Sequence, residues 1–256
     1  MSKKKRNIEK ISISIIVPCL NEEGNVRAAV CSVKEALSKA CAFADYEILI
    51  INDGSTDSTG AVIDAIAAAD RRVKAVHSGR NMGFGYSYTE GVRRASMDYI
   101  VMVPGDNEIP ANALEKIFSS VDRADVMIPY TANTEVRKPA RRALSRLFVI
   151  GMNILFGLDL KYYNGTCVIR SALLKKIPMK TWGFAYMASI LVRLIRSGAV
   201  YAEIAVDIRQ RQSGTSKALR PASVLSVLQA VLVLFWDVRV RNRADYRAEP
   251  RRVEAR

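Results

Sequence analysis

Polar side chains follow four apolar, strand-like runs in the first half of this chain, each at the point where a run ends. The residues at these four ends are carboxylates and carboxamides together with small residues. They are Pro18, Asn21 and Glu22 after the first run, Asp53 after the second, Asn81 and Gly83 after the third, and Asp106 and Glu108 after the fourth. Parallel strands end at one edge of their sheet, and ligands of such sheets bind beyond that edge. The spacing therefore predicts one pocket. Its carboxylates would bind a base and a ribose, and it would also hold a metal ion and a phosphate.

The elements that must position these residues alternate in type along residues 11–136. The expected strands are Ile11–Val17, Glu47–Ile51, Val73–His77, Tyr99–Val103 and Val126–Pro129, and the expected helices are Val26–Ala40, Thr59–Ala69, Gly85–Ala95 and Ala111–Val121. Repeated strand-helix-strand units predict an α/β fold with a doubly wound, mainly parallel, Rossmann-like sheet. Further along, we expect a helix at Arg137–Phe156, a strand at Cys167–Arg170, a helix near Tyr186–Ser197, a strand at Val200–Ile208 and a polar loop at Arg209–Arg220.

Positive charge is concentrated in the second half of the chain. The net charge is +14, and residues 137–256 hold 23 Lys and Arg against 7 Asp and Glu. Such asymmetry favours an anionic partner, either a phosphate or an anionic lipid surface. Nucleic acid is the least favoured partner, because no zinc finger and no regular series of stacking aromatic residues is present.

The C-terminal stretch Pro221–Trp236 is uncharged, but it is shorter than the roughly 20 residues that a membrane-spanning helix needs. It predicts a C-terminal amphipathic helix that lies in the membrane interface, or equally an ordinary helix packed on the domain. The expected organisation is a basic arm at 1–10, one domain at 11–220 with a nucleotide-binding half (11–136) and an acceptor half (137–220), and the helix with a basic tail at 221–256.

Several other kinds of site are disfavoured. The only histidine is His77 and the four cysteines form no C-x-x-C pair, which argues against a zinc site and fits a reducing, cytosolic setting. Gly83-x-Gly85 lacks the third glycine of a dinucleotide fingerprint, and no P-loop is present. A nucleotide held by carboxylates and a metal is typical of nucleotide-sugar sites.

Three stretches occur in an order that resembles glycosyltransferase family 2, and most closely its branch that transfers a mannose-type sugar to dolichyl or polyprenyl phosphate. They are Val17-Pro18…Asn21-Glu22-Glu23, Asn52-Asp53-Gly54-Ser55-Thr56-Asp57 and the late Arg211-x-x-Gly214-x-Ser216-Lys217. The resemblance covers residues 12–220 and implies an A-type glycosyltransferase fold.

The resemblance also implies a role for each matching position. Pro18, Asn21 and Glu22 would line the nucleotide-sugar pocket, Asp53 would read the base or ribose, Asn81 and Gly83 would belong to the loop over the nucleotide, Asp106 would contact Mg²⁺ or Mn²⁺, and Arg211, Ser216 and Lys217 would close on the phosphates. Asp106, Arg211 and Lys217 are the expected catalytic residues. The family's first acid of Asp-x-Asp is Pro104 here. Because positions i and i+2 of extended backbone face the same way, Glu108 is expected to act as the further metal ligand.

The activity implied is an inverting transfer of a hexose from a GDP- or UDP-linked donor to a polyprenyl phosphate. A divalent cation, Arg211 and Lys217 would neutralise the leaving nucleoside diphosphate. The lipid phosphate is itself an anionic nucleophile, so no general base is needed. The partners of the protein would be the nucleotide sugar, the lipid phosphate and the membrane surface. The protein would be peripheral on the cytoplasmic face, and its oligomeric state is left open.

Two alternatives stay open. The same fold could transfer sugar to a glycan or protein hydroxyl, in which case Glu108 or Asp159 would have to act as general base. The loss of an acid at Pro104 instead favours a catalytically weak, membrane-docked scaffold that binds a nucleotide sugar. The stretch Tyr162-Tyr163-Asn164-Gly165, where this branch often has an acid before the glycine, leaves the acceptor undetermined.

Overall fold

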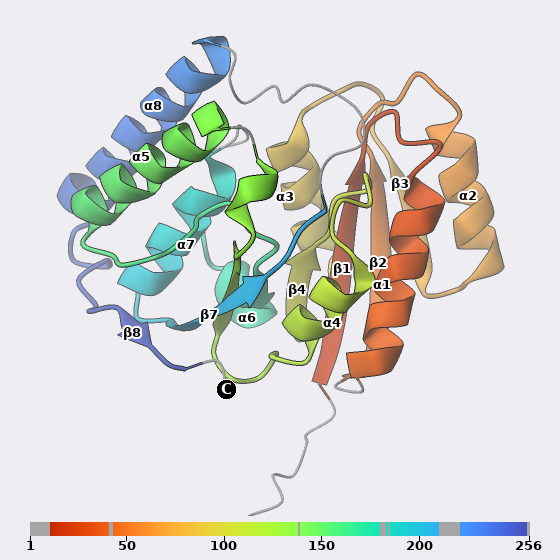
Figure 1. Cartoon of the computed structure of the whole chain (residues 1–256), viewed down its shortest axis with the longest axis horizontal. Coiled ribbons are helices and arrows are strands. Elements are labelled where there is room, and N and C mark those ends of the chain that lie inside the picture. The colour runs from red at the N-terminus through yellow and green to blue at the C-terminus, as the bar shows by residue number, and fades with distance from the viewer. Residues whose placement is uncertain are drawn as a thin grey trace, which may run out of the picture.

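A mixed sheet of eight strands organises the computed structural model, which describes residues 11–40, 43–137, 139–179, 183, 185–209 and 221–254 (Figure 1). The strands are β1 (Ile11–Cys19), β2 (Phe43–Asn52), β3 (Val73–His77), β4 (Tyr99–Met102), β5 (Val126–Thr131), β6 (Val168–Arg170), β7 (Val200–Val206) and β8 (Arg251–Arg252). Their order is β3-β2-β1-β4-β6-β5-β7-β8. All neighbouring strands are parallel except where β6 pairs with β4 and β5, so the predicted mainly parallel α/β sheet is confirmed.

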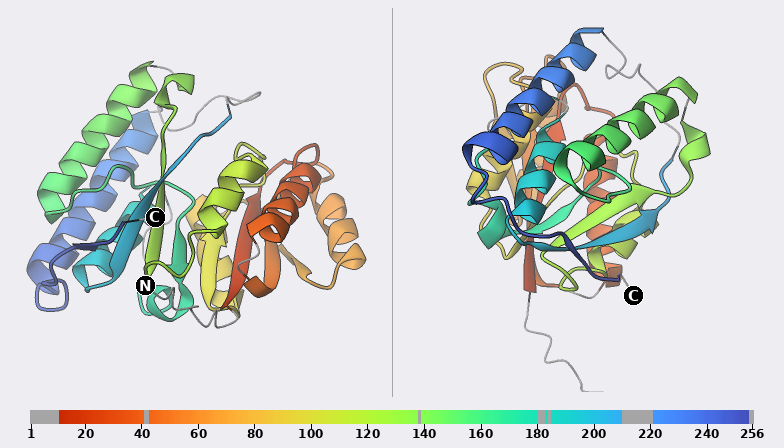
Figure 2. Two further views of the ribbon diagram at one scale, coloured as in Figure 1. Left: turned by 60° about the horizontal axis from the view of Figure 1, so that its bottom comes forward. Right: turned by 90° about the vertical axis from the view of Figure 1, so that its left-hand side faces the viewer.

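Helices cover both faces of this sheet. They are α1 (Val26–Ala40), α2 (Thr59–Ala69), α3 (Phe84–Arg94), α4 (Ala111–Phe118), α5 (Pro139–Phe156), α6 (Ser171–Leu174), α7 (Tyr186–Arg196) and α8 (Pro221–Phe235), with a 3-10 turn at Thr134–Val136 and a π-helical turn at Trp236–Arg241. Successive residues of β1 point to opposite faces, so Ile15 joins the core with α1, α2 and α4 while Ile16 joins the core with α3 and α7. Figure 2 shows α5 and α8 as an outer layer over α7.

Local sequence patterns predicted most of these boundaries. The helices Val26–Ala40 and Thr59–Ala69 and the strand Val73–His77 have the predicted ends. β2 starts earlier than expected, at Phe43, and β8 was not predicted because two residues carry no periodicity. The position of β6 was predicted, but its antiparallel direction was not. A strand of three residues does not encode the direction in which the chain crosses the sheet. The predicted arm at 1–10 and most of the polar loop Arg209–Arg220 lie outside the described residues.

The C-terminal helix α8 is apolar on its exposed side as well as on its buried side, which corrects the prediction of an amphipathic helix. Leu234 is 3% exposed, whereas Leu225, Leu232 and Trp236 are 68%, 70% and 62% exposed. Pro221–Phe235 contains no charged residue, so it has no strongly polar face to oppose the apolar one. No helix in the part of the chain that the structure describes has both the length and the apolar character needed to cross a membrane.

Glu47 joins four segments at the amino-terminal edge of the sheet. Its buried carboxylate pairs with Lys74 Nζ (2.6 Å) and accepts hydrogen bonds from Ser14 Oγ (2.7 Å) and from the backbone N–H of Ser96 (2.7 Å). Burial alone would raise the pKa of this carboxyl, but the hydrogen bonds from Lys74, Ser14 and Ser96 outweigh it and lower the pKa.

This lowered pKa predicts acid sensitivity. The carboxylate of Glu47 stabilises the fold above the unfolded glutamate pKa of about 4.3, and that stabilisation is lost as the pH falls below it through the folded pKa. The urea midpoint of the wild type should therefore decline over this acidic range more steeply than that of Glu47→Gln, which is less stable at neutral pH but has no charge to lose. Parallel pH profiles for the two proteins would contradict this role.

Candidate active site

The first two strand-end loops are bonded to each other at the carboxyl edge of the sheet. Asn21, in the left-handed conformation (φ +57°) that asparagine tolerates, accepts the backbone N–H of Thr56 at Oδ1 (2.9 Å). Its own N–H donates to Ser55 Oγ (3.0 Å), and the N–H of Glu22 donates to Thr59 Oγ1 (2.8 Å). The predicted wall of the nucleotide pocket is thus held against the loop after β2.

Asp53 connects the second loop to the third. Its side chain is buried, and its carboxylate accepts the backbone N–H of Met82 at Oδ1 (2.8 Å) and of Gly83 at Oδ2 (2.9 Å). Its own N–H donates to the carbonyl of Cys19 (2.9 Å). The structure therefore brings Asp53 and Gly83 together, with Asn81 exposed in the same loop.

The fourth loop lies on the first. The N–H of Gly105 donates to the carbonyl of Pro18 (3.2 Å), and a Cβ on Gly105 would lie only 2.5 Å from Cys19 Sγ. Burial first, and then the nearby carboxylates of Glu22 and Asp106, raise the pKa of the Cys19 thiol to about 12. Cys19 thus stays a neutral thiol between two predicted site carboxylates. Sequence reasoning did not select it, because a cysteine without a histidine or second cysteine nearby carries no chemical signal.

The contact between Gly105 and Cys19 predicts a specific rescue. Gly105→Ala is expected to lower the free energy of unfolding by about 1–3 kcal/mol, the usual cost of overpacking, and to displace the segment that carries Asp106. The double variant Cys19→Ala/Gly105→Ala should regain part of this loss, because the sulfur is gone and the nearest atom of residue 19 is then Cβ at 3.6 Å. Urea denaturation measures both effects.

Gly24→Ala is the matched control, since a Cβ there meets nothing within 4 Å. It should leave the urea midpoint close to that of the wild type. Equal losses in the single and double variants would show that the thiol is not what excludes a side chain at position 105.

Asp106 and Glu108 are separated by a turn, so the extended geometry predicted for them is wrong. Asn107 has φ +55°, and the N–H of Glu108 donates back to Asp106 Oδ1 (3.2 Å). Ser32 Oγ donates to Asn107 Oδ1 (3.0 Å) and ties the turn to α1. Among the residues that the structure describes, no three acidic, histidine or cysteine side chains converge on a metal-sized site. Asp106 and Glu108 are the two carboxylates in this turn that could contact a metal ion.

Two cation–aromatic pairs lie at the carboxyl end of β5. The Arg137 guanidinium lies 5.3 Å from the Tyr162 ring centroid and donates to the Tyr162 hydroxyl (3.2 Å) and to Thr131 Oγ1 (3.1 Å). Lys161 Nζ lies 4.4 Å from the Tyr130 centroid and donates to its hydroxyl (3.1 Å). Neither cation forms an ion pair with a carboxylate in the described part of the chain, although Lys161 lies near Glu203, whose carboxylate accepts the Lys161 backbone N–H (2.6 Å).

The predicted phosphate-closing residues Arg211, Ser216 and Lys217 lie outside the described residues, and their roles stay predictions. The segment that leads toward them is described as far as Arg209. The backbone N–H of Arg209 donates to the carbonyl of Glu108 (3.3 Å). The chain therefore enters this predicted loop directly beside the turn after β4.

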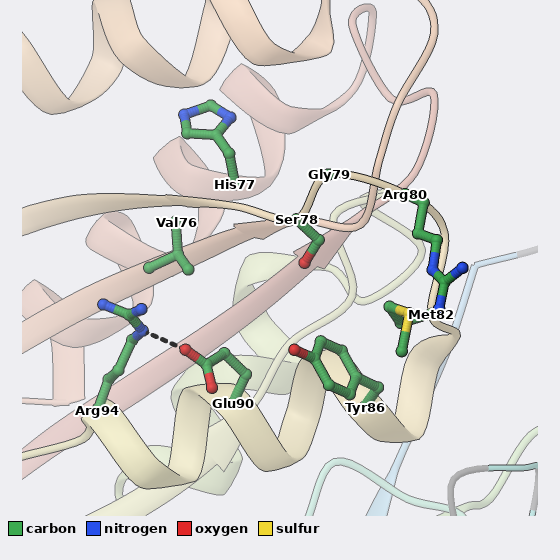
Figure 3. A pocket seen from close by; sticks show the side chains of 9 residues that line it. All are labelled: Val76, His77, Ser78, Gly79, Arg80, Met82, Tyr86, Glu90 and Arg94. Carbon is green, nitrogen blue, oxygen red and sulfur yellow. Dashed lines mark hydrogen bonds and ion pairs between the residues drawn. The ribbon is translucent and has the colours of Figure 1, made fainter.

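A separate cavity of about 610 Å³ opens between β3 and α3, where Tyr86 and Glu90 project from the helix toward the strand (Figure 3). Hydrogen bonds from Arg93, and then from Arg94, lower the pKa of Glu90 to about 2, so its charge is compensated. The cavity adjoins the loop at Arg80 but contains none of the strand-end carboxylates. It shares Arg80 and Met82 with the loop that the resemblance places over the nucleotide.

Comparison with known proteins identifies the family of the chain. The glycosyl transferase family 2 model matches residues 14–177 of the chain. Polyprenol monophosphomannose synthase of Mycolicibacterium smegmatis is 28% identical over 241 residues, covering 89% of this chain and 87% of that protein. Undecaprenyl-phosphate mannosyltransferase of Micrococcus luteus is 24% identical over 236 residues, covering 87% of this chain and 95% of that protein. Some other relatives are longer, and the chain spans only 38% to 45% of their length.

The fold also matches a solved enzyme structure. Glucosyl-3-phosphoglycerate synthase from Mycobacterium tuberculosis, in complex with Mg²⁺ and uridine diphosphate, superposes with a TM-score of 0.65 at 17% identity, over 88% of this chain and 79% of that one. At this identity the likeness shows the fold alone, which is the glycosyltransferase α/β architecture expected from the sequence. The family model matches more than half of this chain. The chain therefore belongs to glycosyl transferase family 2 and is a glycosyltransferase.

Proposed function

We propose that this glycosyltransferase moves a hexose from a GDP- or UDP-linked sugar to a polyprenyl phosphate, with inversion. The observation that carries the proposal is the placement of two kinds of charge along one sheet edge. Glu22 and Asp106 lie near Cys19 on the donor side, whereas Arg137 and Lys161 lie at the carboxyl end of β5. The first group suits a nucleotide and a cation, and the second suits the phosphate of an acceptor. The printed names of two relatives aligned over most of their length, which refer to polyprenol and undecaprenyl phosphates, support this acceptor class.

Asp106 and Glu108 are the residues that would hold Mg²⁺ or Mn²⁺. Their hard oxygen donors fit such a cation, since Mg²⁺ in nucleotide sites commonly takes one or two protein carboxylates together with substrate phosphates. When bound, the cation would supply positive charge to the leaving diphosphate. The Mg²⁺ and uridine diphosphate in the matching solved structure support a divalent cation here.

The remaining chemistry follows from charge and placement. An oxygen of the acceptor phosphate bonds to the anomeric carbon as the bond from that carbon to the nucleoside diphosphate breaks, which inverts the configuration. The acceptor phosphate is already an anion, so no proton has to be removed. Arg137 and Lys161 would hold it in position, and Arg211 and Lys217 would neutralise the departing diphosphate.

An apolar outer face would bring the active site to its lipid acceptor at the cytoplasmic side of a membrane. On α5, Leu147 and Ile154 are 68% and 76% exposed, and α8 beside it exposes Leu225 and Leu232 (Figures 1 and 2). The two helices meet at their C-terminal ends, where the Phe156 and Phe235 ring centroids lie 6.3 Å apart. Exposed apolar side chains gathered on two neighbouring helices favour a membrane contact, and the excess of arginine in this half of the chain favours anionic lipids.

The donor and acceptor are tested together. A thermal-shift panel of GDP- and UDP-linked sugars with and without Mn²⁺ should select one donor, and that donor should then glycosylate a short-chain polyprenyl phosphate. Turnover with hydroxyl acceptors and none with the lipid phosphate would favour transfer to a glycan or protein. Binding of a nucleotide sugar without turnover on either acceptor would favour the scaffold.

Membrane docking is tested by co-sedimentation with phosphatidylcholine vesicles containing phosphatidylglycerol. The variant Leu147→Glu/Ile154→Glu should bind these vesicles at least about tenfold more weakly, because it removes two exposed apolar side chains from the contact. Ala65→Glu/Ala68→Glu on α2 makes the same charge change on an exposed helix across the sheet and should bind as the wild type does. Equal binding by both variants would place the contact elsewhere.

A further inference from the structure

The proposed acceptor cation Lys161 lies on a segment without regular structure. Residues 157–167 connect α5 to β6 and form neither helix nor strand. Asn153 on α5 holds part of this segment, since its Nδ2 donates to the carbonyl of Leu160 (3.0 Å) and its Oδ1 accepts the hydroxyl of Tyr163 (2.7 Å). Neither of these bonds reaches Lys161 itself.

Glu203 on β7 holds the backbone of Lys161. Its Oε1 accepts the Lys161 N–H at 2.6 Å, and a carboxylate acceptor makes such a bond stronger than one between two neutral groups. The side chain of Lys161 then extends to the Tyr130 hydroxyl (3.1 Å). One carboxylate therefore fixes the point from which the ammonium group extends.

This carboxylate lies in an unfavourable place for a charge. The Glu203 side chain is fully buried, on the same face of β7 as the buried Tyr201. Its Oε2 makes no hydrogen bond in the part of the chain that the structure describes. Burial raises the pKa of the Glu203 carboxyl, and the Lys161 N–H and the positive charges of Arg252 and Lys161 oppose that rise without cancelling it. A buried carboxylate of this kind needs a counter-charge.

The counter-charge comes from the C-terminal strand. Arg252 Nη2 lies 3.2 Å from Glu203 Oε2. Arg252 belongs to β8, which pairs in parallel with β7 at the end of the sheet (Figure 1). The N–H of Val253 donates to the carbonyl of Tyr201 (2.9 Å) and continues this pairing. A strand of two residues thus brings a guanidinium to the buried carboxylate.

We propose that Glu203 and Arg252 are positioning residues for the acceptor. Arg252 supplies the counter-charge of Glu203, and Glu203 holds the backbone of Lys161 so that its ammonium group meets the acceptor phosphate in a fixed place. Neither Glu203 nor Arg252 contacts the phosphate. The inference rests on the proposed role of Lys161 and requires nothing of the donor site. It gives β8 a part in sugar transfer.

Hydrogen exchange in the ligand-free protein tests the hold on Lys161. In the wild type, the Lys161 amide should be protected although it lies outside regular structure. In Glu203→Gln and in Arg252→Gln it should exchange at least about tenfold faster, because the carboxylate is lost in the first variant and loses its counter-charge in the second. An unprotected Lys161 amide in the wild type would overturn the proposal, and this measurement needs no variant to fold.

Arg251→Gln is the matched control. It removes the same charge from the neighbouring, exposed position of β8, whose side chain points to the other face of the sheet. The Lys161 amide should exchange in this variant as it does in the wild type. Equal acceleration in Arg251→Gln and Arg252→Gln would show that the general charge of β8 matters and not the pair with Glu203, which contradicts the proposal.

Kinetic constants test the effect on the acceptor. With a short-chain polyprenyl phosphate, Glu203→Gln and Arg252→Gln should raise the acceptor KM about tenfold and leave the donor KM within about twofold, since the bond they weaken holds only the acceptor cation. Arg252→Lys should recover part of the loss, because lysine also carries a positive charge. An unchanged acceptor KM, or an equal rise of both KM values, would reject a role in positioning the acceptor.

A double-mutant cycle tests whether the effect passes through Lys161. Lys161→Met alone should raise the acceptor KM, and adding Arg252→Gln should then raise it little further, because residues that act through one another are not additive. A second rise of about tenfold in the Lys161→Met background would mean that Arg252 acts by another route, and the proposal would be wrong.

The two proposals fail separately. If the wild type transferred no sugar to a polyprenyl phosphate, the proposed acceptor would be wrong, while the exchange data would still decide whether Glu203 and Arg252 hold Lys161. If transfer occurred but Lys161→Met left the acceptor KM unchanged, the proposed acceptor would stand and the positioning role would fall.

Discussion

Asp106→Asn is expected to lower kcat/KM for sugar transfer by about 10²- to 10³-fold, the usual loss when one preorganised electrostatic group is removed from an active site. Asparagine keeps the size of the side chain and an oxygen that can accept the N–H of Glu108, as Asp106 Oδ1 does at 3.2 Å. Only the charge changes, so the turn after β4 should persist. A second readout is binding of uridine or guanosine diphosphate by calorimetry: Mn²⁺ should tighten it for the wild type and should no longer do so for the variant.

The matched control for this experiment is Asp122→Asn. Asp122 lies in an exposed turn before β5 with φ +77°, a conformation that asparagine adopts as readily as aspartate. Its kcat/KM should stay within about twofold of the wild type, as for most surface substitutions. If Asp106→Asn retained both transfer and the effect of Mn²⁺ on nucleotide binding, the metal would be held by other residues and the proposed site would be wrong.

Asp237→Ala is expected to lower the free energy of unfolding by about 3–5 kcal/mol, the typical effect of leaving one member of a buried ion pair alone. Arg193 on α7 and Asp237 after α8 are both buried, and Arg193 Nη2 lies 2.8 Å from Asp237 Oδ2. Asn242 Nδ2 donates to the other carboxylate oxygen (2.8 Å), and Arg193 also donates to Ser189. Truncation would leave a guanidinium in the core without its counter-charge, and urea denaturation measures the loss.

Two further variants make this result specific. Glu35→Ala removes an exposed partner of Lys39 at a similarly short separation, 2.6 Å, and should change stability by less than about 1 kcal/mol. Arg193→Met/Asp237→Leu should recover much of what Asp237→Ala loses, since apolar residues can replace both members of a buried pair. A loss no larger for Asp237→Ala than for Glu35→Ala would mean that the pair does not hold α8 and its apolar face to the domain.

Apolar periodicity was enough to predict α1, α2 and β3 to the residue, because each is specified by the residues within it. It was not enough for β6, which runs antiparallel between β4 and β5, or for β8. The direction and neighbours of a strand depend on where the chain returns from a distant helix. The nature of α8 was mispredicted for a different reason, since Pro221–Phe235 contains no charged residue that could form a polar face.

The sequence alone predicted which residue types gather at the four strand ends, since a polar turn after an apolar run is a local pattern. Which atoms meet there was decided only by the tertiary structure. Asp53 faces backbone donors 29 and 30 residues away, and Cys19 fills the space that a side chain on Gly105 would need. The turn at Asn107 likewise replaced the extended geometry expected for Asp106 and Glu108. Contacts between distant segments depend on how the sheet and helices pack, and a single strand end does not encode that packing.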